Sequence, residues 1–102
     1  MQTKTLFHII KHNIKLLPIR IKLNNDELKN SFEKVSLKLA SYNEDDFDIK
    51  GGKKFQEGIA NLESTFKTLN NKANTPSGAL ELIEFAGNFP TYIKSLSEEE
   101  TS

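Results

Sequence analysis

The 102-residue chain contains no cysteine and no tryptophan. Without cysteine, a disulfide framework, a thiolate metal site and a thiol nucleophile are all excluded. No apolar run approaches the roughly 18 uninterrupted residues needed to cross a bilayer. The nearest candidate, residues 6–23, is interrupted by six charged or histidine side chains and lacks the compact apolar run of a secretory signal. A membrane-spanning helix is therefore not expected.

The chain also has no excess of positive or negative charge, because its 14 basic and 14 acidic residues cancel. Thirteen of the basic residues are lysines and one is arginine, a bias typical of AT-rich genomes. The distribution is uneven: residues 1–25 hold five basic and no acidic residues, whereas residues 26–102 hold nine basic and fourteen acidic ones. The net charge thus favours no class of partner, but the basic head is a candidate for contact with an anionic surface.

Apolar residues recur at helical spacing in four segments, which predicts an all-α fold, a small bundle of three to four amphipathic helices. The predicted helices cover residues 4–17, 26–42, 53–70 and 77–96, with a break near Pro90. A chain of this length forms one core, so residues 1–102 are predicted to be a single helical domain. Within it, residues 1–23 form a basic helix plus an extended connector, and residues 97–102 an acidic flexible tail.

Helix ends are predicted from capping residues and prolines. Pro18 is expected to end the first helix, because proline lacks the N–H donor that a helix interior requires. Asn24 or Asn25 is expected to cap the second helix, and Thr75 followed by Pro76 to begin the fourth. Within the second and third segments the apolar stripes have spacings of four, three, four and three. These stripes are Leu28, Phe32, Val35, Leu39 and Tyr42, then Phe55, Ile59, Leu62, Phe66 and Leu69. In the first segment, one helical face is formed by Phe7, Ile10, Ile14 and Leu17, and the fourth helix runs through Ala79, Leu82, Ile83 and Ala86.

Three short patterns suggest ligand sites but fit them poorly. His8 and His12 have the spacing of paired zinc ligands, yet Ile9 occupies the position where a metalloprotease helix carries its glutamate. Residues 46–57 place acidic residues as a calcium loop does, but lysines occupy its fifth and eighth positions. Residues 50–54, Lys-Gly-Gly-Lys-Lys, lack the spacing of a phosphate-binding loop. No metal site and no cofactor is therefore expected.

Catalytic residues are also hard to assemble. The two histidines belong to one helix turn, and the acidic residues near Asp46 and Glu84 are those of solvated surfaces. We therefore expect a protein that is not an enzyme. The leading hypothesis is a non-catalytic protein–protein interaction module, such as a small subunit, adaptor or inhibitor, with a protein partner or a second copy of the chain bound to it.

Large aromatic residues outside the best apolar stripes are the candidate partner-binding residues, namely Phe47, Phe89 and Tyr92. These aromatics can equally close the ends of the bundle. The alternative function is binding to nucleic acid or a membrane surface through the basic head. Its candidate residues are Lys4, Lys11, Lys15, Arg20 and Lys22. An intracellular location is favoured, and a mitochondrial one stays open because the first helix is basic and amphipathic.

Overall fold

The computed structural model describes residues 1–101 and builds them into four α-helices and one short 3₁₀-helix, without a strand. The α-helices are α1 (Thr3–Arg20), α2 (Asp26–Ala40), α3 (Lys53–Lys72) and α4 (Pro76–Thr101). The 3₁₀-helix η1 (Glu44–Phe47) lies in the connection between α2 and α3. The predicted all-α bundle is confirmed.

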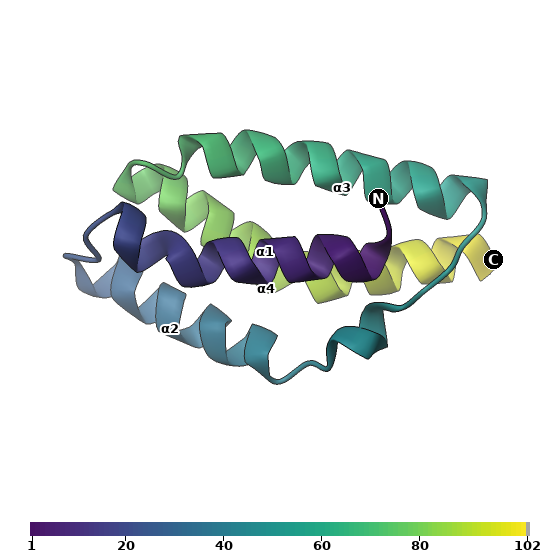
Figure 1. The fold of residues 1–102 in the computed structure, drawn as a ribbon, viewed down its shortest axis with the longest axis horizontal. Helices are drawn as coiled ribbons and strands as arrows, with labels where there is room; N and C mark the ends of the chain where they lie inside the picture. The colour runs from purple at the N-terminus through teal and green to yellow at the C-terminus, as the bar shows by residue number, and fades with distance from the viewer. Residues whose placement is uncertain (102) are drawn as a thin grey trace.

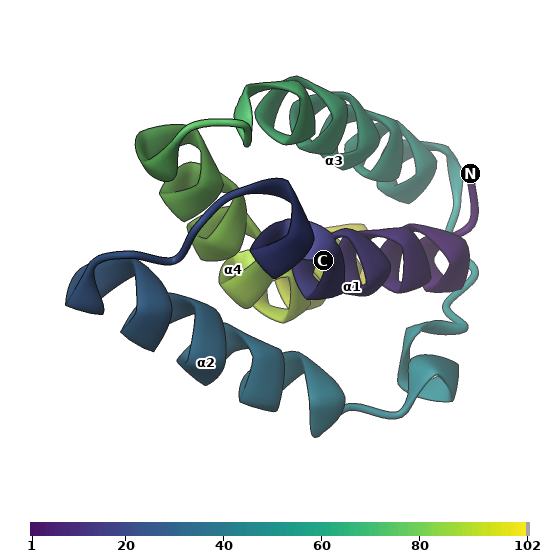
Figure 2. The same cartoon turned by 60° about the vertical axis from the view of Figure 1, so that its left-hand side comes forward.

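Consecutive helices run in opposite directions, and α1 lies across α4 at the centre of the bundle (Figure 1). The flanking helices α2 and α3 lie on opposite sides of this central pair (Figure 2). Each of them packs along α4, while the backbones of α2 and α3 do not come into contact within the described chain. The bundle is therefore organised around α4, the longest helix.

The buried side chains form one core cluster. The predicted inner face of α1 is confirmed, since Phe7, Ile10, Ile14 and Leu17 are all essentially inaccessible. In the other helices the predicted stripes are divided between buried and half-buried positions. Buried members include Leu28, Leu39, Phe55, Ile59, Phe66, Leu82 and Ile83; half-buried ones include Phe32, Val35, Tyr42, Leu62 and Leu69.

The predicted start of α2 is confirmed at atomic detail. The side chain of Asn25 accepts a hydrogen bond from the backbone N–H of Leu28 at 2.8 Å, so Asn25 is the cap. At the α3–α4 corner, the Thr75 hydroxyl accepts a hydrogen bond from the backbone N–H of Gly78 at 3.1 Å. Each interaction satisfies a donor that the first turn of a helix leaves without a partner.

Pro18 was wrongly predicted to end the first helix, and the break predicted near Pro90 does not divide the fourth. The first helix continues past Pro18 to Arg20, so the extended connector is shorter than expected and begins at Ile21. The guanidinium of Arg20 anchors this last turn by donating to the side-chain and backbone oxygens of Asn70, at 2.6 and 2.7 Å. A proline removes only one N–H donor of a helix, and contacts from other elements can compensate for that loss.

The fourth helix likewise continues through Pro90 to Thr101. Pro90 cannot donate to the carbonyl of Ala86, and beside that position the Lys38 ammonium donates to the carbonyl of Gly87 at 2.6 Å. The predicted acidic tail is therefore helical over residues 97–101, and Ser102 lies outside the described residues. By contrast, α2 ends at Ala40, two residues before its predicted end.

Candidate functional site

The second half of α4 lacks a helix along one side. The helix α2 has 15 residues and α4 has 26, so α2 covers only part of the α4 flank. Beyond Ala40 the chain turns into η1, whose backbone does not come into contact with the backbone of α4. Only side chains fill the space between η1 and the second half of α4, and a groove is left there.

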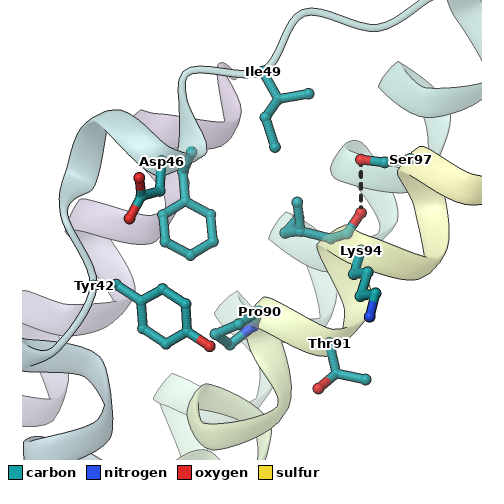
Figure 3. Close-up of a pocket in the computed structure, with 9 residues that line it drawn as sticks. Tyr42, Asp46, Ile49, Pro90, Thr91, Lys94 and Ser97 are labelled. Carbon is teal, nitrogen blue, oxygen red and sulfur yellow. Dashed lines mark hydrogen bonds between the residues drawn. The ribbon is translucent and has the colours of Figure 1, made fainter.

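The groove has a volume of about 440 Å³ and is open to solvent. Its walls come from two parts of the chain, the α2–α3 connection and the second half of α4 (Figure 3). We call it the distal groove, and its lining residues are Tyr42, Asp46, Phe47, Ile49, Pro90, Thr91, Ile93, Lys94 and Ser97. Most of the lining is apolar, and charged groups stand on both sides, Asp46 on η1 and Lys94 on α4.

One wall of the distal groove is fixed to α1 by an aromatic cluster. The rings of Phe7 and Phe47 are stacked with centroids 4.0 Å apart, and Phe89 lies 5.8 Å from Phe47. Tyr42 adds a tilted ring 5.5 Å from Phe47. Because offset or tilted aromatic pairs are favourable beyond their buried area, this cluster holds η1 in place.

Two polar side-chain pairs on the surface join the same elements. The ammonium of Lys4 donates to Asp45 at 2.6 Å, and Nδ1 of His8 lies 2.8 Å from Oε1 of Glu44. The hydrogen bond to His8 lowers the pKa of Glu44, and the hydrogen bond to Asp45 raises the pKa of Lys4. Both pairs are exposed, so their contribution to stability is small compared with that of the buried rings.

A second, smaller depression lies on the other side of the same half of α4, between α3 and α4. It has a volume of about 280 Å³ and is lined by Gly58, Asn61, Leu62, Tyr92, Ser95 and Leu96. Tyr92 is half-buried there, with its ring 5.7 Å from that of Phe85. The last turns of α4 are thus a ridge between two hollows with apolar linings.

The candidate aromatic residues divide into two groups. Phe47 and Phe89 are 4% and 0% exposed, so both are core residues and the hypothesis that they contact a partner directly is not supported. Their burial follows from contact with Phe7, which is 40 or more positions away in the sequence. Tyr92, by contrast, is accessible at the α3–α4 depression. Phe47 still matters to the distal groove, since it forms part of its floor.

The candidate basic residues do not converge on one patch. Lys4 and Arg20 are engaged in the contacts described above, and Lys11 lies 5.8 Å above the ring of Phe7. Lys15 and Lys22 are exposed. The anionic-surface function therefore stays a prediction from the sequence alone.

The structure does not support the three weak ligand-site patterns, which are the histidine pair, the calcium-like segment and residues 50–54. His8 is paired with Glu44, and the part of the chain that is described contains no group of three or more metal-ligating side chains that could hold an ion. The calcium-like segment is divided, because Asp46 belongs to η1 while α3 begins at Lys53. The lysines of the 50–54 segment are exposed at the start of α3.

Several residues of the distal groove were missed by the sequence analysis, notably Tyr42, Ile49, Pro90, Lys94 and Ser97. Tyr42 had been assigned to a core stripe and Pro90 to a helix break. One signal was present: Pro90, Lys94 and Ser97 follow one another at spacings of four and three, which places them on one helical face. Because Lys94 and Ser97 are polar, this spacing did not stand out as an apolar stripe.

Comparisons with protein-family models, with curated proteins and with solved structures find no match to this chain. Within residues 1–101, no helix combines the length and the apolar character that crossing a membrane requires.

Proposed function

We propose that this chain is a non-catalytic protein-interaction module that binds a partner over the second half of α4. The observation that carries the proposal is the distal groove, an open hollow with a mostly apolar lining beside the second half of α4. Clefts of this volume with a mostly apolar lining and a few polar groups are typical of binding sites.

Two further features support this assignment. The hollow on the α3 side of α4 extends the accessible apolar surface around the same helix turns. The large exposed apolar side chains elsewhere, Met1, Ile19 and Leu37, lie singly on separate elements. Single exposed apolar residues are normal on protein surfaces, so the second half of α4 is the best candidate for a binding surface.

The test is site-specific photocrosslinking with the full chain in the cells that express it. A photoreactive phenylalanine analogue replaces Thr91, which is exposed at the groove, or Asn30, which is exposed on the first half of α2. We expect a discrete protein adduct from position 91 and none of the same mass from position 30. Both substituted chains should keep the helical circular dichroism of the natural one.

A blocking substitution makes the test specific. Ser97→Trp places a large side chain in the groove and should abolish the adduct at position 91 while the chain stays folded. If that variant unfolds, Lys94→Glu on the exposed wall serves instead and should weaken the adduct. Failure to form an adduct at position 91, or equal adducts at positions 91 and 30, would refute the proposed function.

A further inference from the structure

A small cavity borders the start of α1. The connection that leads into α3 passes the first turn of α1 in both views of the bundle (Figures 1 and 2). Where the two meet, they partly enclose a volume of about 170 Å³. We call it the α1 cavity, and its lining residues are Gln2, Thr3, Lys4, Phe47, Asp48, Ile49, Lys50 and Gln56.

The first turn of α1 has backbone donors without partners. The first hydrogen bond of the helix runs from the backbone N–H of Leu6 to the carbonyl of Gln2, at 3.0 Å. Among the described residues, no group accepts from the backbone N–H of Thr3, Lys4 or Thr5, and the Gln2 side chain does not cap the helix. No acidic residue lies in this turn, in contrast to the first turn of α2. The positive end of the helix dipole is therefore available to an external acceptor.

The hydroxyl of Thr3 is a second, independent donor at the same cavity. Thr3 is only 2% exposed and lines the cavity, and among the described residues its hydroxyl has no hydrogen-bond partner. Buried polar groups nearly always have a partner, and a hydroxyl can donate to any acceptor that enters the cavity. The exposed amide of Gln56, in the first turn of α3, adds a further donor to the lining.

The charged side chains around the cavity balance one another. The ammonium of Lys4 donates to Asp45, and the nearby carboxylate of Asp48 contributes to raising the pKa of Lys4. Lys50 is exposed and has no ion pair among the described residues. Two ammonium groups thus face two carboxylates, so the preference for a ligand has to come from the N–H groups and the Thr3 hydroxyl.

We propose that the α1 cavity binds a small aliphatic monocarboxylate, whose oxygens accept from the first-turn N–H groups of α1 and from the Thr3 hydroxyl. Carboxylates and phosphates both bind at helix starts, where the N–H groups and the dipole favour negative charge. Asp48 opposes a second negative charge on the ligand, which favours a carboxylate over a phosphate dianion. Phe47 and Ile49 provide apolar surface for a short alkyl chain. The proposal goes beyond the proposed function, since no residue of α4 lines this cavity.

The experiment titrates the isotope-labelled full chain with sodium propionate at neutral pH and records its backbone amide resonances. Sodium chloride keeps the ionic strength constant. We expect the amide resonances of Thr3, Lys4 and Thr5 to shift and to saturate in the millimolar range, as for a ligand of few atoms. Propionamide, which has the same shape and no charge, is the matched ligand control and should not cause these shifts. Inorganic phosphate should bind more weakly than propionate.

Two variants test the assigned groups. Thr3→Val keeps the branched shape and removes the hydroxyl, so it should weaken propionate binding by about 5-fold, as expected for one lost hydrogen bond. Thr5→Val is the matched control, because Thr5 is exposed in the same turn and does not line the cavity. Asp48→Asn, an exposed change, should raise the affinity for phosphate by about 3-fold and that for propionate by less. All three variants should keep the helical circular dichroism of the natural chain.

Several results would overturn the inference. These are shifts that do not saturate, an equal response to propionamide, and equal affinities of Thr3→Val and Thr5→Val for propionate. Tighter binding of phosphate than of propionate would show that the cavity does not select a monocarboxylate. The photocrosslinking at position 91 reports on a different surface, so its outcome and that of the propionate titration are independent.

Discussion

The substitution Phe47→Ala tests whether η1 is held to the bundle as described. Phe47 is 4% exposed, stacks on Phe7 at 4.0 Å between centroids, and lies 5.8 Å from Phe89. It is the most buried anchor of a connection whose other contacts with α1 include the edge contact of Tyr42 with Phe7 and two exposed polar pairs. Removing the ring should therefore detach or loosen η1.

The expected cost follows from the size of the ring and from its place in the fold. Burial losses for Phe→Ala changes are about 3–5 kcal/mol, and the lower end applies where neighbouring groups can collapse into the space. Phe47 borders an open groove, so we expect a decrease in the free energy of unfolding of about 3 kcal/mol. For a domain of this size, that loss corresponds to a fall in Tm on the order of 12 °C or more.

Urea denaturation followed by circular dichroism measures this change, and Leu37→Ala is the control. Leu37 is 74% exposed, so its truncation should alter the free energy of unfolding by no more than about 0.5 kcal/mol. A loss below about 1 kcal/mol for Phe47→Ala would refute the reasoning, because a buried phenylalanine costs more than that. Phe47 would then be accessible in solution, and its role as a direct partner contact would be restored.

Three further predictions concern the helix ends and the surface pairs. Asn25→Ala should lower the free energy of unfolding by about 1 kcal/mol in urea denaturation, because it removes the α2 cap, whereas Asn24→Ala should have little effect. Gly78→Ala should lower Tm, because its Cβ would overlap the backbone carbonyl of Lys72. Ser77→Ala, at the exposed neighbouring position, is the control, and equal Tm values for the two variants would contradict this account. At pH values above the ordinary pKa of a glutamate, near 4.5, Glu44→Gln should lower Tm. The difference in Tm between the variant and the natural chain should close as the pH falls through the lowered pKa of Glu44. Thermal denaturation at a series of pH values measures this, with Glu33→Gln as an exposed control. A difference in Tm that grows towards acid pH would contradict the prediction that ionised Glu44 stabilises the fold.

The parts of the fold that were predicted correctly depend on local pattern. The spacing of Phe7, Ile10, Ile14 and Leu17 alone defines the inner face of α1, because residues three and four apart share a helical face. The Asn25 cap depends on a donor only three residues away. Such features are encoded within one or two helical turns and need no knowledge of the rest of the chain.

Both helices continue through Pro18 and Pro90, and long-range contacts lie next to each proline. Arg20 is held by Asn70, 50 positions away, and Lys38 reaches the carbonyl of Gly87, 49 positions away. The local rule that proline ends a helix is sound, but it describes an isolated segment. Packing against another helix decides whether the segment ends, and that packing is not visible in the sequence.

The candidate site was predictable only in part, for the same reason. Phe47 and Phe89 stood out because they lie outside the clearest stripes, yet both join Phe7 in a cluster that spans the whole chain. The distal groove exists because α2 ends before α4 does, and this difference in length is a property of two elements together. Sequence patterns named Tyr92 as a candidate partner-binding residue but could not locate the hollow beside it.

Basic side chains of the N-terminal head, which contains no acidic residue, form contacts within the fold. Lys4 and His8 of α1 pair with Asp45 and Glu44 of η1, at one end of the helix. At the other end, Arg20 donates to the backbone oxygen of Asn70 in the last turn of α3, where the helix dipole is negative. These contacts tie both ends of α1 to other elements of the bundle. The basic residues that resemble a binding surface for nucleic acid or a membrane thus contribute to placing α1 along α4. An anionic partner would have to use Lys15 and Lys22, which are exposed.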